Sequence, residues 1–231
     1  DVTAYVNYGG ENTIVVRVDA SMEEGWFYEG AGIYRHVYLH KTNSLHVAQN
    51  GTYVTSEITN DNALITAEVK LENKGHFKGN VQINQTILDA SGKQITSNVE
   101  NVEAPEFYKT NTYISKLNVK KPLLWDVDLP NLYQLVTEIK SEGKVIDSYK
   151  TSFGIRAIKF DPENGFFLNG KHVKLKGTNN HQDHAGIGTA LPDEIQYYRI
   201  AKLKEMGSNA YRCSHHPPTP ELLDACDKLG M

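Results

Sequence analysis

The pattern of apolar and polar residues changes twice along the chain. Near the start, alternating residues predict short strands at Thr3–Val6, Thr13–Val18 and Tyr34–Leu39. Three strands are too few for a domain of their own. We therefore interpret residues 1–40 as the closing part of a larger all-β unit.

Between residues 41 and 155, short alternating runs follow one another at regular spacing. Turn-forming clusters such as NKG, ASGK and SEGK separate these runs. About seven strands over roughly a hundred residues are typical of an immunoglobulin-like β-sandwich. The expected strands are Leu45–Ala48, Tyr53–Thr59, Ala63–Glu72, Asn80–Leu88, Thr112–Val119, Tyr133–Lys140 and Lys144–Phe153. Trp125 lies in a loop between Pro122 and Pro130, where we expect it to plug the end of the sandwich rather than serve as a platform for a ligand.

From residue 156 onward, strands alternate with helices. A hairpin, FFLNGKHVKL, carries Asn169 and Gly170 at a favoured type I′ turn. It leads to a strand that ends in GTNNHQDH, a helix over Pro192–Met206, a strand that ends in YRCSHHP, and a helix over Glu221–Leu229. A closed (β/α)8 barrel takes about 250 residues. The pattern therefore predicts only the start of such a barrel, with the remainder beyond Met231.

Charge and composition narrow the range of partners. The net charge is −4 and both signs are interspersed, so we expect neither nucleic acid nor an anionic membrane surface as a partner. Cys213 and Cys226 are too few for a disulfide scaffold and are expected to be buried thiols. The chain opens at Asp1 without a leader; we expect any targeting signal upstream, which leaves the compartment open, an extracytoplasmic one included.

Histidines gather where the two predicted barrel strands end. His181 and His184 follow the first strand, and His215 and His216 follow the second. Parallel strands end on the same side, so these residues are expected on one rim. Zinc needs three or four converging ligands at set spacings, which adjacent loop histidines do not provide. A neutral imidazole both donates and accepts hydrogen bonds, which suits a ligand rich in hydroxyl groups. We expect His184 and His216 only to tie their loops.

Two further features have alternative interpretations. Arg212 lies two residues before Ser214 and is expected on the same side of the sheet, at the interior or rim of the barrel. It could orient an acidic catalytic group or form a structural salt bridge. The loop Gly25–Gly32 places three aromatic residues between glycines, which favours a domain junction over a sugar platform.

Four segments together resemble glycoside hydrolase family 2, which contains β-galactosidases, β-glucuronidases and β-mannosidases. They are WFYEGAGIYRHVYL, FGIRAIKFDPENGFFLNGKHVKLKG, GTNNHQDH and NAYRCSHHPPTPELLDACDKLGM. The resemblance implies that residues 1–40 end a sugar-binding jelly roll. It further implies an immunoglobulin-like sandwich over 41–155 and the start of a catalytic TIM barrel over 156–231.

The resemblance also implies roles for single residues. His181, His215 and Asn180 are expected to contact the terminal sugar, with Asn179 and Arg212 supporting them. Asn180 stands where many members carry arginine, and the same holds for Trp26; His216 stands where tyrosine is usual. These departures leave the sugar specificity open.

The implied activity is that of a retaining exo-β-glycosidase, most similar to a β-galactosidase, acting on a β-linked oligosaccharide or glycan. Such enzymes use two glutamates, an acid/base and a nucleophile, which the resemblance places beyond Met231. This chain alone is therefore expected to be inactive and to hold no cofactor. A metal requirement of the whole enzyme and a homo-oligomeric state stay open. A β-glucuronidase, a non-catalytic carbohydrate-binding module and a zinc protein are the alternatives.

Overall fold

The computed structural model describes residues 1–19, 21, 32–215 and 217–231. The chain divides into two compact units, Asp1–Val37 and Tyr38–Met231. Within the described residues, neither of the two helices has the length and the apolar run that crossing a bilayer requires.

The described residues of the first unit contain no strand, so the strands predicted at Thr3–Val6 and Thr13–Val18 are wrong. Tyr34–Leu39, which runs into the second unit, is not a strand either. Ile14 and Val15 show the reason, because their side chains are 77% and 85% exposed. Alternation alone does not hold a strand; it also needs a hydrogen-bonded neighbour and a buried face. The jelly-roll interpretation of residues 1–40 stays a prediction.

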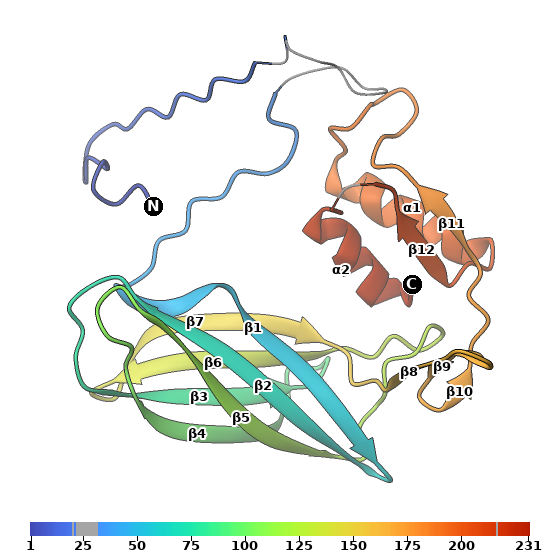
Figure 1. Ribbon diagram of the computed structural model, residues 1–231, viewed down its shortest axis with the longest axis horizontal. Coiled ribbons are helices and arrows are strands. Elements are labelled where there is room, and N and C mark those ends of the chain that lie inside the picture. The colour runs from blue at the N-terminus through green and yellow to red at the C-terminus, as the bar shows by residue number, and fades with distance from the viewer. Residues whose placement is uncertain (20, 22–31, 216) are drawn as a thin grey trace. The chain divides into compact units, whose positions relative to one another are not determined.

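Residues 45–153 form seven strands in two antiparallel sheets (Figure 1). One sheet has the order β1-β2-β5 and the other has the order β4-β3-β6-β7. The strands are β1 (Leu45–Thr59), β2 (Asn62–Asn73), β3 (Asn80–Leu88), β4 (Gln94–Glu103), β5 (Thr110–Lys120), β6 (Tyr133–Ser141) and β7 (Lys144–Phe153).

Alternating apolar residues bury one face of each sheet. Ala63 and Ile65 of β2 cluster with Leu135 of β6, although the two strands belong to different sheets. The sheets therefore pack face to face as a β-sandwich. The two runs predicted at Leu45–Ala48 and Tyr53–Thr59 are one strand, β1, whose pairing with β2 shifts between Val47 and Thr52.

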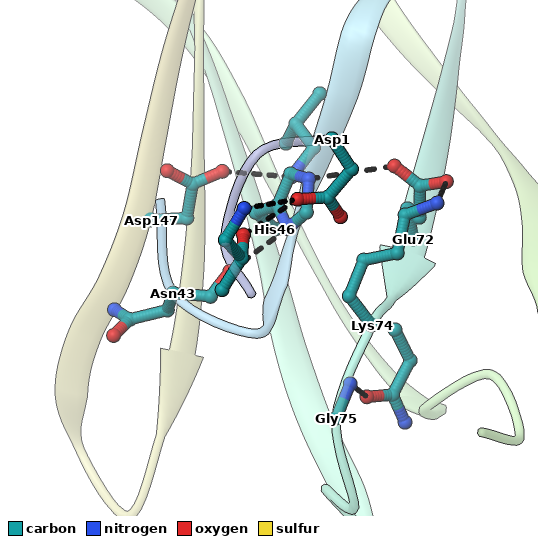
Figure 2. A network of polar contacts seen from close by, with 10 residues as sticks. Asp1, Asn43, His46, Glu72, Lys74, Gly75 and Asp147 are labelled. Carbon is teal, nitrogen blue, oxygen red and sulfur yellow. Dashed lines mark hydrogen bonds and ion pairs between the residues drawn. The ribbon is translucent and has the colours of Figure 1, made fainter. Parts of the chain in front are cut away.

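Polar contacts fasten the open edge of β1 (Figure 2). The Asp147 carboxylate on β7 accepts a hydrogen bond of 2.7 Å from the backbone N–H of Val47, which links the two sheets. On the other side, His46 Nε2 lies 3.5 Å from a carboxylate oxygen of Glu72 on β2, and Lys74 Nζ lies 2.8 Å from the other oxygen. The bond to Asp147 occupies a backbone N–H that an edge strand otherwise leaves unpaired.

The segment after the sandwich confirms the predicted hairpin. β8 (Ile158–Asp161), β9 (Gly165–Leu168) and β10 (Lys171–His172) form an antiparallel sheet. Asn169 and Gly170 both have positive φ, 51° and 76°, as a type I′ turn requires.

The remaining elements alternate between strand and helix, as the sequence predicts (Figure 1). They are β11 (Gly177–Asn180), α1 (Asp193–Glu205), β12 (Ala210–Cys213) and α2 (Pro220–Leu229). Pro192 precedes α1, and the Thr219 hydroxyl caps α2 by accepting from the N–H of Leu222.

Trp125 joins the sandwich to α2. Only 3% of its surface is exposed, which agrees with the predicted plug at the end of the sandwich and not with a platform for a ligand. Its indole N–H donates a hydrogen bond of 2.8 Å to the backbone carbonyl of Asp227, and the Arg156 guanidinium lies 4.8 Å from the ring centroid. Asn169 donates to the backbone carbonyl of Trp125 at 3.0 Å, so the hairpin also takes part. The indole is therefore buried with its N–H hydrogen-bonded, as a buried tryptophan generally requires.

A lysine and a glycine complete the joint. Lys204 Nζ at the end of α1 donates to the backbone carbonyls of Val127 and Gly230, at 2.6 and 2.9 Å. Gly230 ends α2 with a φ of 77°, and a Cβ there would lie 2.2 Å from the carbonyl oxygen of Val127. Both the backbone conformation and the close approach therefore require glycine at this position.

We expect Trp125→Ala to lower the free energy of unfolding by about 3–5 kcal/mol, because it removes a large buried side chain. Trp125→Phe keeps most of the apolar surface and should lose only about 1 kcal/mol with the bond to Asp227. Urea unfolding followed by circular dichroism measures both. The control is Leu129→Ala in the same loop, whose side chain is 69% exposed and whose loss should cost less than about 0.5 kcal/mol. Equal losses in all three variants would contradict the buried joint.

Candidate functional site

The site begins with the parallel pairing of β11 and β12. Four residue pairs, from Gly177 with Ala210 to Asn180 with Cys213, set the register. The carboxyl ends of both strands therefore lie at one edge, and the turns that carry His181 and His215 leave from this edge. The two imidazole rings lie edge to face, with centroids 5.4 Å apart and planes at 85°. Both side chains are exposed, and the peptide bond between Ser214 and His215 is cis.

A polar cluster lies beside the histidines on one face of the two strands. Arg212 Nη1 donates a hydrogen bond of 2.9 Å to the hydroxyl of Ser214. The side-chain oxygen of Asn179 accepts from both Arg212 and Ser214. Arg212 and Ser214 thus share a face, as their spacing predicts, with Arg212 exposed at the rim and Ser214 buried. Among the described residues no carboxylate forms an ion pair with Arg212.

Asn180 has a different environment from the other predicted site residues. Its amide donates to the backbone carbonyl and to the hydroxyl of Thr178, at 2.8 and 2.9 Å. Side chains alternate along a strand, so Asn180 lies on the face opposite to Asn179. There it lines a small cavity together with Gln196 and Cys213. Contact between Asn180 and a sugar stays a prediction, and it would require the amide to leave Thr178.

The structure places His184 in a tight turn held by its backbone. The N–H and C=O of His184 exchange hydrogen bonds with Gly188, each at 2.9 Å. This loop is therefore tied by the main chain of His184. His216 lies outside the described residues, and so do residues 25–31 of the aromatic loop, Trp26 included.

Two residues that sequence reasoning missed hold the site in place. Asn209 accepts from the N–H of Lys176 at 2.8 Å and donates to the carbonyl of Lys174 at 3.1 Å, which aligns the starts of β11 and β12. Arg199 on α1 donates to the backbone carbonyls of His181 and Gln182. Arg199 lies next to Ile200 on the buried face of the helix, and this position is the one signal that could have revealed it.

An apolar layer behind the strands supports the rim. Ile200, Leu222 and Ala225 of the two helices pack together with Tyr211 and Cys213 of β12 and with Cys226, Leu229 and Met231. Burial raises the pKa of Tyr211, of Cys213 and of Cys226, the last to about 12. Both cysteines are free and half-buried, so the expected burial is only partial. Their raised pKa values make them poor nucleophiles at neutral pH.

We expect Cys226 to resist alkylation in the folded chain. With a pKa of about 12, on the order of one thiol in ten thousand is ionised at pH 8. Mass spectrometry after brief iodoacetamide treatment should find Cys226 unmodified in buffer and fully modified in urea, with the denatured sample as the control. Rapid labelling of Cys226 in the native chain would show that the layer behind the strands is open.

Comparisons with known proteins agree with this geometry. Residues 45–156 match the glycosyl hydrolases family 2, and residues 161–231 match the TIM barrel domain of the same family. The chain belongs to glycosyl hydrolase family 2. The family resemblance and the start of a barrel domain are thereby confirmed.

Relatives with different named activities match the whole chain. It is 39% identical to the β-galactosidase BoGH2A of Bacteroides ovatus and 32% identical to a β-glucuronidase of Formosa agariphila. A crystal structure of a family 2 member from Bacteroides cellulosilyticus has a TM-score of 0.79 and 39% identity over 82% of this chain. The chain spans 27%, 26% and 26% of these three proteins, respectively.

Proposed function

We propose that this chain is part of a longer retaining exo-β-glycosidase that removes terminal β-linked galactose. The observation that carries this proposal is the edge-to-face pair of His181 and His215 at the carboxyl ends of β11 and β12. TIM-barrel enzymes carry their active sites at this end of the strands. Family 2 glycosidases act on β-linked sugars, so a sugar is the ligand that the rim is proposed to bind.

The two imidazoles suit the hydroxyl groups of a sugar ring. A neutral imidazole offers one donor and one acceptor, so a single ring can satisfy two neighbouring hydroxyls. Two rings at 85° direct these groups along different axes, which favours a ligand with hydroxyls on more than one side. In this proposal His181 and His215 bind the terminal sugar, and Asn180 joins them only if it leaves Thr178.

The neighbouring cluster suits a supporting role. Arg212 hydrogen-bonds Ser214 and Asn179, both neutral, so its charge is not neutralised within the cluster. An exposed guanidinium at the rim can hold and orient a carboxylate that another segment supplies. We propose that Arg212, positioned by Asn179, orients a catalytic carboxylate of the whole enzyme.

The catalytic glutamates are proposed to lie beyond Met231. A retaining glycosidase needs two carboxyl groups about 5 Å apart, one as nucleophile and one as acid/base. Among the described residues, β11 and β12 are the only parallel strands, whereas a TIM barrel has about eight. The chain also spans only 27% of BoGH2A. On this proposal residues 1–40, 41–155 and 156–231 are the end of a jelly roll, an immunoglobulin-like sandwich and the start of the barrel.

Two alternative functions are tested alongside this proposal. A β-glucuronidase is supported by relatives of that name at similar identity, 32% for the protein from Formosa agariphila. A non-catalytic carbohydrate-binding module would instead bind sugar through residues 41–153 alone, which calorimetry on that segment would detect.

The activity test compares the longer polypeptide with the 231-residue chain. We expect the longer polypeptide to hydrolyse an aryl β-galactoside faster than the matching β-glucuronide, and the 231-residue chain to hydrolyse neither. The chain is the matched control, because it carries the rim but not the proposed glutamates. Preference for the glucuronide would select the alternative sugar. Enzyme-like turnover by the chain itself would show that the glutamates are placed wrongly.

Replacing either rim histidine in the longer polypeptide should weaken catalysis. We expect His181→Ala and His215→Ala each to lower kcat/KM by roughly 10- to 150-fold, or about 1.5–3 kcal/mol, through loss of a polarised hydrogen bond. Steady-state kinetics with the preferred aryl glycoside measures this. His172→Ala, an exposed histidine in the hairpin, is the control and should leave kcat/KM unchanged. Normal kinetics in both rim variants would reduce His181 and His215 to loop supports.

A further inference from the structure

We propose that Arg199 is a positioning residue, which sets the place of His181 against His215 by holding the backbone just past the end of β11. Its importance for catalysis rests on the function proposed above, whereas its effect on the two rings does not. Arg199 itself lies on helix α1, eighteen positions along the chain from His181.

The contact replaces strand pairing at the point where pairing stops. The N–H of Ser214 donates to the carbonyl of Asn180 at 2.9 Å, which is the last bond that links the ends of the two strands. The next two carbonyls along the chain accept from Arg199 instead. Arg199 Nη2 lies 2.7 Å from the oxygen of His181, and Nη1 lies 2.9 Å from the oxygen of Gln182.

The geometry is specific to a guanidinium. Its N–H groups form a rigid planar fork, so two neighbouring acceptors can be held at once and in a fixed relation. Hydrogen bonds from a charged donor are also stronger than those between neutral groups. A lysine carries one compact ammonium, which can approach the same carbonyls but does not impose this fixed geometry.

The helix gives Arg199 a firm base. The neighbouring Ile200 is fully buried against α2, and Gln196 one turn earlier is buried as well. Arg199 and Tyr211 line the same small cavity as the backbone turn. Its positive charge opposes the rise that burial causes in the pKa of Tyr211, as expected of a guanidinium close to that ring. The position of α1 therefore determines, through Arg199, where the backbone of the His181 turn lies.

Loss of the Arg199 contact is expected to change the relative position of the two imidazole rings first, and the rate of catalysis as a result. His181 carries both the carbonyl that Arg199 holds and the ring that faces His215, so releasing the carbonyl lets the ring move. A displacement of about 1 Å at a binding group can cost on the order of 100-fold in rate. A residue that only stabilises the loop would change the melting temperature without changing the relation of the two rings.

The first experiment uses the 231-residue chain with isotope-labelled histidine. Wild-type protein should give an NMR cross-peak between the ring protons of His181 and His215, whose centroids are 5.4 Å apart. We expect Arg199→Met to lose this cross-peak, and the matched control Lys202→Met to keep it. Lys202 lies on the same helix and pairs with Glu205 on the exposed face. A cross-peak of full intensity in Arg199→Met would overturn the proposal.

The second experiment uses the longer polypeptide and guards against a variant that fails to fold. We expect Arg199→Ala to lower kcat/KM for the aryl galactoside on the order of 100-fold, with a smaller loss in Arg199→Lys. Added methylguanidine should restore activity to Arg199→Ala but not to His181→Ala. Unchanged kcat/KM in Arg199→Ala, or an equal response of both variants to methylguanidine, would overturn the positioning role. If wild-type polypeptide shows no glycosidase activity, the proposed function fails, and the ring cross-peak still decides the role of Arg199.

Discussion

The parallel pairing of β11 with β12 is the constraint on which the site depends. Antiparallel strands would send the turns that follow them to opposite ends of the sheet, and His181 could not meet His215. The register matters as much as the direction, because a slip of one residue would turn Arg212 away from Asn179. Asn209 supports this register, because its side-chain amide accepts from the N–H of Lys176 and donates to the carbonyl of Lys174 in the segment that leads into β11. The geometry of the site therefore depends on the alignment of the two strands, which the side chain of Asn209 supports.

The sequence predicts strands most reliably where a sheet buries one face. β2, β3 and β6 alternate between buried and more exposed residues, and each was found close to its observed bounds. β4 was missed because none of its residues is buried and its composition is polar. The opposite error occurred in residues 1–37, where alternation is present but the described residues offer no strand to pair with. In both cases the outcome depends on the segments that pair with the strand or pack against it, and a local sequence pattern does not reveal these segments.

Within the site, the sequence was informative about strand ends and uninformative about backbone acceptors. His181 and His215 could be placed on one rim because strand direction alone determines it. Arg199 could not be found in this way, because its partners are backbone carbonyls. Every residue has such a carbonyl, so no residue type in the sequence indicates the contact. The face of Asn180 was open to prediction, because the alternation that unites Arg212 with Ser214 also separates Asn180 from Asn179. The resemblance to a family supplied roles, whereas geometry decides which side chains are free to fill them.

The joint around Trp125 has a mechanical consequence. Trp125 meets Asp227, Val127 meets Lys204 and Gly230, and Asn169 meets the backbone of Trp125, so contacts reach both helices and the hairpin. A single contact leaves two bodies free to rotate about it, whereas contacts to both helices and to the hairpin restrict that rotation. A force that turns the sandwich would thus act directly on the ends of α1 and α2. Lengthening the loop at residues 123–131 would therefore tilt the sandwich against the two helices.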